Sequence, residues 1–240
     1  MQKTIGGIET HYTYDGLGNR VSAQRGATTT RYYYDQAGRL LFEANGSGTI
    51  ITYYFFKGMR LVAMSTASGA TYFYHYDKNA NTVAMTDGNG NPVNAYAYTP
   101  FGGIAGTTET VANPFKYVGA YGVMDEGNGI YFMKNRYYDS TTGRFLQKDP
   151  IGLAGGTNPY RYVDNNPVTL VDPEGLLPDD SPQWDRIKID IMAHELDEPI
   201  DWATNVAAGF GDAFFTSWAV NRLTGADAYV NKTSSAYRRA

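Results

Sequence analysis

Two aspartates stand at the head of the same short motif, Asp-Pro-x-Gly-Leu, at residues 149–153 and 172–176. Two carboxyl groups can hydrolyse a peptide bond when one is ionised and takes a proton from water, while the other is protonated and polarises the carbonyl. Close contact between like charges produces this state, because it separates the two pKa values. Asp149 and Asp172 are therefore candidates for an acid/base pair.

Each motif is also well suited to a turn. An aspartate caps the turn, proline fixes φ at the next position, and glycine accepts the positive φ of a type II turn. From the motifs alone, two separate turns and one divided active site both remain open.

A weaker repeat fills the first hundred residues. Alternating aromatic residues lead into Tyr-Asp and then a turn of glycine and polar residues, at Tyr14-Asp15 and, 20 residues later, at Tyr34-Asp35. A third copy at Tyr76-Asp77 has Ala80 where the other two have the turn glycine. The residues 87–92 and 99–103 show two further turn patterns.

These patterns predict a mainly β fold. Alternating tyrosines predict a strand with rings on each face, and Asp-x-x-Gly predicts a hairpin turn. A unit of two short strands cannot bury its own face, whereas stacked units can. We expect an antiparallel sheet built as an array of hairpins.

The composition changes after Leu176. A polar linker at residues 178–182 precedes a stretch in which apolar residues from Trp202 to Leu223 recur near helical spacing, interrupted by Gly209 and Gly211. We predict three parts: Tyr-Asp repeats over residues 1–130, a core carrying the two motifs over residues 131–176, and a short, mainly helical segment over residues 177–240.

Charge and composition narrow the function classes. A net charge of −4 gives no reason to expect a nucleic-acid partner, and the absence of cysteine excludes disulfides and thiolate metal sites. No apolar run follows the amino-terminal lysine, so a secretory signal peptide is not expected. His194 and Glu195 suggest a zinc helix, but the second histidine would fall at Glu198, so we expect neither a metal nor a cofactor.

The order of the motifs resembles the carboxyl-terminal part of the Rhs family, the polymorphic toxins built from tyrosine-aspartate repeats. The resemblance covers roughly residues 8–176. It is carried by Asn135-Arg-Tyr-Tyr-Asp-Ser-Thr-Thr-Gly-Arg-Phe145, the two Asp-Pro-x-Gly-Leu motifs, Asn158-Pro-Tyr-Arg-Tyr162 and Asn166-Pro167.

This resemblance implies a spiral β shell around a toxic carboxyl-terminal domain, and an aspartic self-protease that cuts the toxin from the shell. Carried onto this sequence, the catalytic residues are Asp149 and Asp172, supported by Arg136, and the cut falls between Leu176 and Leu177. Arg144 is also within the motif and could take the role of Arg136.

The resemblance also implies partners and a location. We expect contacts with the rest of a shell or with the chain's own carboxyl-terminal segment, an immunity protein, and a component of type VI or related export. The producer's cytoplasm is the expected location, in a protein that serves competition between bacteria.

Two alternatives remain open on the sequence. One is a non-enzymatic sheet remnant, since a shell needs more repeats than this chain carries. The other is a small toxin in residues 177–240 that acts on a membrane or a protein. Asn205, Asp212 and Asn221 interrupt the apolar stretch there, so a membrane-spanning helix is not expected.

Overall fold

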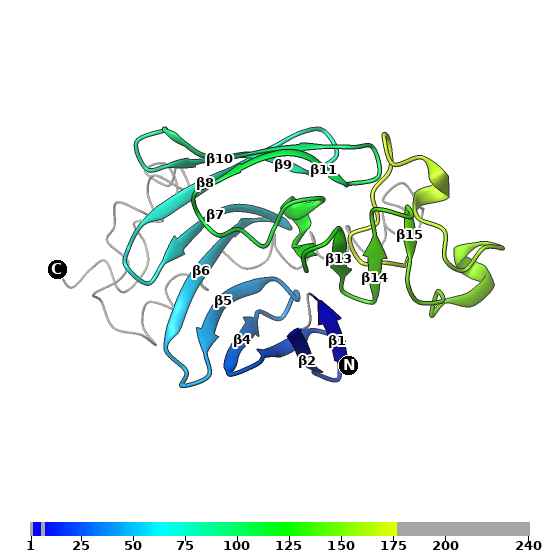
Figure 1. Cartoon of the computed structure of the whole chain (residues 1–240), viewed down its shortest axis with the longest axis horizontal. Helices are drawn as coiled ribbons and strands as arrows, with labels where there is room; N and C mark the ends of the chain where they lie inside the picture. Colours follow the sequence, from blue (N-terminus) through cyan, green and yellow to red (C-terminus); the bar gives the residue numbers. More distant parts are fainter. Residues whose placement is uncertain (1, 6–7, 177–240) are drawn as a thin grey trace, which may run out of the picture. The chain divides into compact units, whose positions relative to one another are not determined.

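A computed structural model describes residues 2–5 and 8–176 of the chain. Their main features are two antiparallel sheets, one of eleven strands and one of four (Figure 1). This confirms the predicted mainly β, hairpin-array fold. The helical segment predicted over residues 177–240 lies outside the described residues, and the boundaries at 130 and 176 stay predictions.

The large sheet is a meander in which each strand pairs with the next along the chain. Its strands are β1 (Gln2–Ile5), β2 (Ile8–Tyr14), β3 (Arg20–Arg25), β4 (Thr28–Tyr34), β5 (Leu40–Asn45), β6 (Ile50–Lys57), β7 (Arg60–Thr66), β8 (Thr71–Tyr76), β9 (Thr82–Asp87), β10 (Pro92–Tyr98) and β11 (Ile104–Glu109).

One five-residue turn joins many of these strands. Its first N–H donates to the fifth carbonyl, and its fourth N–H donates to the first carbonyl. The fourth residue has positive φ, which explains glycine there. Among the described residues the turn occurs at 15–19, 35–39, 45–49, 66–70, 77–81, 87–91 and 99–103. The Tyr-Asp signature marks only some of its occurrences.

The aspartate of the repeat holds this turn together. Asp15 Oδ1 accepts hydrogen bonds from the backbone N–H groups of Leu17 and Asn19, and Asp15 Oδ2 accepts one from the Asn19 side chain. The Asn19 side chain and these backbone donors lower the pKa of Asp15 below its ordinary value. Asp77 and Asp87 receive the same pattern of bonds.

The repeat tyrosines lie mainly on one face of the sheet, which corrects the expectation of rings on each face. Residues two apart share a face of a strand, so a Tyr-x-Tyr pair sends both rings inward. Tyr12 is 4% exposed, and Tyr14 packs beside it in the same core. Rings on the outer face also occur, as where Tyr33 stacks on Phe42 with centroids 4.5 Å apart.

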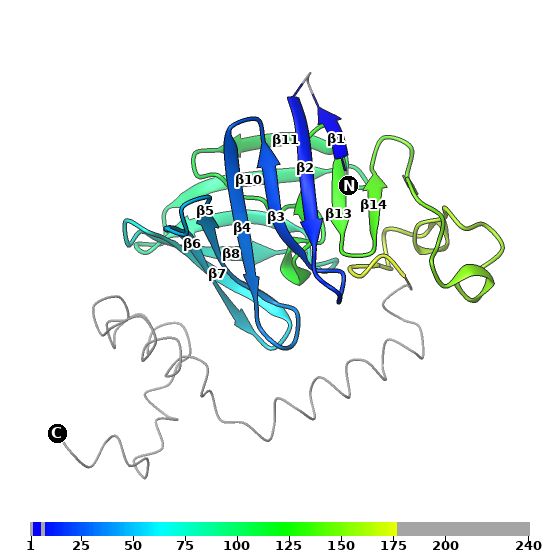
Figure 2. The same ribbon diagram turned by 90° about the horizontal axis from the view of Figure 1, so that it is seen from below.

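The sheet curves, and the chain after β11 runs along its inner side (Figures 1 and 2). Phe115 meets the Tyr54 ring edge-on at 5.0 Å, and its carbonyl accepts a 2.7 Å hydrogen bond from Thr82. The segment then forms a short 3-10 turn, η1 (Gly119–Tyr121), and the second sheet, β12 (Met124–Asp125), β13 (Ile130–Met133), β14 (Arg136–Asp139) and β15 (Arg144–Phe145).

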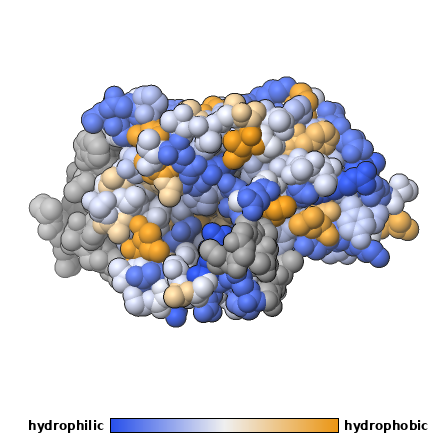
Figure 3. Space-filling model, in the orientation of Figure 1, coloured by the Kyte–Doolittle hydropathy of each residue, from blue (hydrophilic) through white to orange (hydrophobic). Residues whose placement is uncertain are grey.

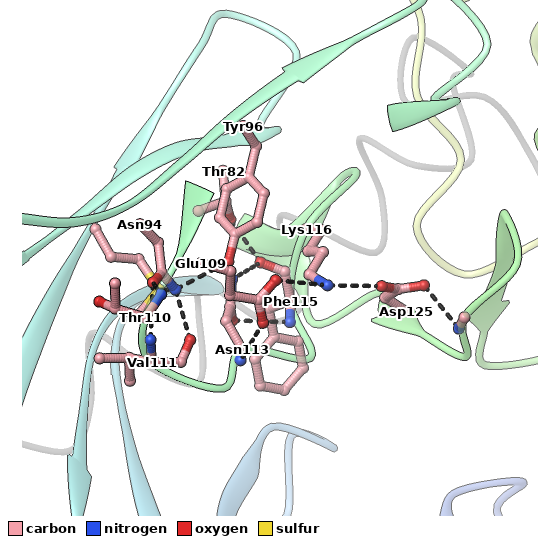
Figure 4. Close-up of polar contacts among 12 residues, drawn as sticks. Thr82, Asn94, Tyr96, Glu109, Thr110, Val111, Asn113, Phe115, Lys116 and Asp125 are labelled. Carbon is pink, nitrogen blue, oxygen red and sulfur yellow. Dashed lines mark hydrogen bonds and ion pairs between the residues drawn. The ribbon is translucent and has the colours of Figure 1, made fainter. Parts of the chain in front are cut away.

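Polar side chains fasten this inner segment to the edge of the large sheet (Figure 4). Asn94 on β10 accepts hydrogen bonds from the N–H groups of Thr110 and Val111, at 2.9 and 3.0 Å. Lys116 lies 2.9 Å from both Glu109 and Asp125, so it joins β11 to β12. The path from one sheet to the other is therefore fixed by specific bonds.

A buried ion pair fastens the opposite part of the large sheet. Arg20 on β3 pairs with Glu126, which follows β12, and Tyr12 donates to the same carboxylate. The Arg20 guanidinium lies 4.9 Å from the Tyr12 ring centroid and 4.6 Å from that of Phe132. Burial lowers the pKa of Arg20, but Glu126, together with Tyr32 and Tyr137, more than offsets burial, so the pKa of Arg20 is raised.

The outer surface is mixed. On the face drawn in Figure 3, apolar residues of the described part form small separate patches among hydrophilic ones. In residues 2–5 and 8–176, none of the helices is long and apolar enough to cross a membrane.

Removing one member of the buried pair should destabilise the fold. We expect Glu126→Gln to lower the free energy of unfolding by about 3–5 kcal/mol, because it leaves the charge of Arg20 buried without a partner. The double variant with Arg20→Met should recover part of the loss. Urea unfolding followed by far-ultraviolet circular dichroism measures both.

The control for this experiment is Asp164→Asn, which breaks the half-exposed contact of Asp164 with Arg161. An exposed pair contributes only about 0–1 kcal/mol. Equal losses for Glu126→Gln and Asp164→Asn would contradict a special role for the buried pair.

Candidate active site

Arg136 brings the two motif aspartates together. Its Nη1 lies 2.9 Å from Asp149 Oδ2, and its Nη2 lies 3.4 Å from Asp172 Oδ2. All three residues are buried, with Arg136 and Asp172 2% exposed and Asp149 8% exposed. The two Asp-Pro-x-Gly-Leu motifs thus meet at one arginine, although their aspartates are 23 positions apart in the sequence.

The arginine is fixed on every side by the second sheet and its loops. It is the first residue of β14, where it pairs with Met133 of β13. Its Nε donates to the Gly175 carbonyl at 2.6 Å, and its Nη1 donates to the Pro159 carbonyl at 3.3 Å. The guanidinium also lies 3.6 Å from the centroid of the Phe145 ring, a distance typical of a cation–π contact.

The first motif positions Asp149 by forming a turn. Asp149 Oδ1 accepts a 3.0 Å hydrogen bond from the N–H of Ile151, and the Asp149 carbonyl accepts one from Gly152 at 3.1 Å. A side chain at Gly155 would collide with Asp149 Oδ2, so this approach requires glycine. The second carboxylate oxygen, Asp149 Oδ2, faces Arg136.

The second motif is a turn of the same kind. Asp172 Oδ1 accepts a 2.9 Å hydrogen bond from the N–H of Leu176, and the Asp172 carbonyl accepts one from Gly175 at 3.3 Å. Gly175 has φ +65°, which favours glycine. Each motif is therefore a turn, and the carboxyl groups of the two turns also meet at one arginine. That they form a divided active site stays a prediction.

Charge balance distinguishes the two carboxyl groups. One guanidinium and two ionised carboxylates would leave a net negative charge in a buried site, and binding of one proton removes it. Burial raises the pKa of Asp172 to about 7, and the charge of Asp149 adds to the increase. Burial also lowers the pKa of Arg136, against the opposing effect of both carboxylates. The site is suited to hold one protonated and one ionised carboxyl group near neutral pH.

The structure separates the two candidate arginines. Arg144 is exposed, on β15, where it lies opposite Asp139. Arg136, and not Arg144, contacts the two aspartates. Leu176 is the last described residue, so Leu177 and the bond between them lie outside the described residues, as do His194 and Glu195.

Several contributors to the site could not be named from the sequence. The carbonyls of Pro159 and Gly175 bind Arg136 through the backbone, which leaves no signature in a side chain. Asn135 begins one of the motifs and Gly155 follows another, but nothing in the sequence assigned either residue a role at the site. Within the part of the chain that the structure describes, no three histidine or acidic side chains gather as a metal site would require.

Comparison with known families and proteins gives a consistent result. The model of the teneurin YD-shell family matches residues 1–82 and 60–168. Toxin subunit YenC2 of Yersinia entomophaga is 38% identical over 94 residues, which are 38% of this chain and 10% of that protein. Toxin protein Tse5 of Pseudomonas aeruginosa is 40% identical over 74 residues, 31% of this chain and 6% of that protein.

A longer match is to the tRNA nuclease WapA of Bacillus subtilis, 33% identical over 172 residues, 68% of this chain and 7% of that protein. Among solved structures, a TcdB2-TccC3 crystal structure superposes with a TM-score of 0.59 at 25% identity, covering 72% of this chain and 10% of that one. The chain thus spans a tenth or less of the length of these proteins.

The raised pKa of Asp172 should make stability depend on pH. Between the ordinary aspartate pKa near 4 and the folded value of about 7, the folded protein retains a proton that the unfolded chain has lost. The free energy of unfolding should therefore fall as pH rises through this window and level off above it. From pH 5 to 8 the loss due to Asp172 should be on the order of 3 kcal/mol.

Urea unfolding of the wild type and of Asp172→Asn at pH 5, 6, 7 and 8 measures this effect, because asparagine does not titrate. The intact mass of each sample ensures that only uncut chains are compared. A difference between the two proteins that is constant across this range would contradict the assignment.

Proposed function

Because this chain belongs to the teneurin YD-shell family, we propose that its two Asp-Pro-x-Gly-Leu motifs form an aspartic self-protease that cuts the chain after Leu176. The relatives named above show that it is an Rhs/YD-shell chain related to toxins. The observation that carries the proposal is that the buried side chains of Asp149 and Asp172 contact one arginine. Asp172 is four positions before Leu176, the residue at the proposed cut.

The chemistry divides between the two carboxyl groups. Asp149 lies closer to the guanidinium, at 2.9 Å, and is the better candidate for the ionised group that takes a proton from water. Asp172, with its raised pKa, would donate its proton to the Leu176 carbonyl oxygen as the water oxygen adds to the carbonyl carbon. Transfer of a proton to the Leu177 nitrogen then breaks the C–N bond and leaves a carboxylate and an amine.

The residues just before the proposed cut are held beside the aspartates. The N–H of Leu176 is bonded to Asp172, and the neighbouring Gly175 carbonyl is bonded to Arg136. Reaction within one chain therefore requires little loss of translational freedom. Since the substrate is a unique segment of the same chain, each molecule would react once.

The biological role that fits this reaction is release of a carried segment. Residues 177–240 would leave the sheet structure on cleavage, as cargo in competition between bacteria. Association with other shell or toxin components, an immunity partner, type VI or related export, and a cytoplasmic location in the producer are parts of this proposal. Its support is the likeness to toxins and to Tc toxin structures.

Self-cleavage should depend on all three buried residues. Intact-mass spectrometry of the purified chain should show products of residues 1–176 and 177–240. Asp149→Asn and Asp172→Asn should each slow their appearance on the order of 10²–10⁴-fold, the range for loss of a general acid or base. Arg136→Lys should also be slow, because lysine cannot bind two carboxylates with a planar fork.

Arg144→Lys is the matched control, and it should cleave like the wild type because Arg144 is exposed away from the aspartates. The wild-type rate should fall as pH rises through about 7, where Asp172 loses its proton. A folded wild-type chain that stays whole from pH 5 to 8 would refute the self-protease.

A further inference from the structure

The turn that joins β13 to β14 holds the segment just before the proposed cut. Asn135 donates two hydrogen bonds to the Glu174 carbonyl, one from its backbone N–H at 3.2 Å and one from its side chain at 2.9 Å. The next residue, Arg136, donates to the next carbonyl, that of Gly175. Consecutive residues, Asn135 and Arg136, thus bind the consecutive carbonyls of Glu174 and Gly175.

An ion pair and a close backbone approach fix the same register. Lys134 Nζ lies 2.8 Å from Glu174 Oε2, in a pair that is about one-third exposed. A Cβ at position 175 would lie 2.6 Å from the Met133 carbonyl oxygen and 3.2 Å from the Arg136 nitrogen. Only a glycine can lie here, so a shift by one residue would force Glu174 or Leu176 against this backbone.

The turns of the first two repeats lie near this turn. A Cβ at Gly18 would lie 4.0 Å from Asn135 Oδ1, and one at Gly38 would lie 3.7 Å from Lys134 Nζ. A small cleft between these repeat turns and the second motif is lined by Asn19, Gly38, Lys134, Pro173 and Glu174. Lys134, with φ +44°, thus borders a cleft between the large sheet and the segment.

We propose that Lys134 and Asn135 form a recognition site for the backbone and acidic side chain of the Glu174-Gly175-Leu176 turn, and that this site selects the peptide bond after Leu176. Asn135 is the positioning residue, since its two bonds set the register, and Lys134 adds a preference for an acidic residue two positions before Leu176. The effect on cleavage rests on the proposed self-protease, whereas the binding of Glu174 by Lys134 and Asn135 does not.

Loss of the Asn135 side chain should slow cleavage without changing its pH dependence. Asn135→Ala removes one of the two bonds to the Glu174 carbonyl, and we expect the rate of self-cleavage of the full chain to fall about two- to tenfold, the range for loss of one hydrogen bond. Because Asn135 carries no charge, the factor should be the same at each pH from 5 to 8. A general disturbance of the buried charges would shift the pH midpoint instead.

Two further variants complete the cleavage experiment. Asn91→Ala is the matched control, since it removes an asparagine side chain that bonds the exposed turn aspartate Asp87, and it should cleave like the wild type. Lys134→Glu should slow cleavage about two- to fivefold, the effect of a partly exposed ion pair. Adding Glu174→Lys should restore the rate.

A second measurement reports on the segment without any cleavage. The chain has no cysteine, so Leu176→Cys in the Asp149→Asn protein provides a single thiol. Its alkylation rate should rise about tenfold when Asn135→Ala is added, and should not change with Asn91→Ala.

The combined outcomes separate the two proposals. Wild-type rates of both cleavage and alkylation in Asn135→Ala would overturn the recognition site. A wild-type chain that never cleaves, with alkylation that still rises in Asn135→Ala, would refute the self-protease and support the holding of the segment by Asn135.

Discussion

The site depends on one constraint, which is that a single buried guanidinium faces two buried carboxyl groups. Arg136 can neutralise one of them, and burial of a second uncompensated charge would cost several kcal/mol. Binding of a proton by one carboxyl group avoids this cost, and the raised pKa of Asp172 reflects that. The same condition, one ionised and one protonated carboxyl group, is what hydrolysis by an aspartate pair requires. The electrostatic cost of the buried site and its proposed chemistry therefore have one cause.

The large sheet contributes by fixing where Arg136 can lie. Its inward tyrosines have both a ring for the core and a hydroxyl for a polar partner, as where Tyr14 meets the Tyr137 hydroxyl at 2.8 Å. Tyr137 directly follows Arg136 on β14, and its backbone N–H donates to the Gln147 side chain, two residues before Asp149. The repeats of the large sheet are thus connected to the site, because Tyr14 of the first repeat bonds Tyr137, the neighbour of Arg136.

The sequence predicted the strands and turns well because their causes are local. Asp-x-x-Gly places a capping side chain and a residue tolerant of positive φ at fixed spacing, and even Ala80 adopts φ +62° where the pattern had lost its glycine. The expected division of the rings between the two faces was wrong for the Tyr-x-Tyr pairs, because residues two apart in a strand share a face. The convergence of Asp149 and Asp172 was predictable only through the family resemblance. Their meeting depends on Arg136 and on carbonyls such as that of Pro159, whose role no side-chain pattern encodes.

The choice between Arg136 and Arg144 shows what local sequence cannot decide. The two arginines lie eight positions apart in one motif, each in a strand of the same hairpin sheet. Both strands have a backbone neighbour on each side, because β14 pairs with β13 and β15, and β15 meets residues 160–161 along its other side. Residues paired across two antiparallel strands share a face, and successive residues of one strand alternate between the faces. Arg144 pairs with Asp139, which is three positions from Arg136, so the two arginines project from opposite faces of the sheet. The identity of the arginine is therefore a consequence of strand register, which the motif alone does not encode.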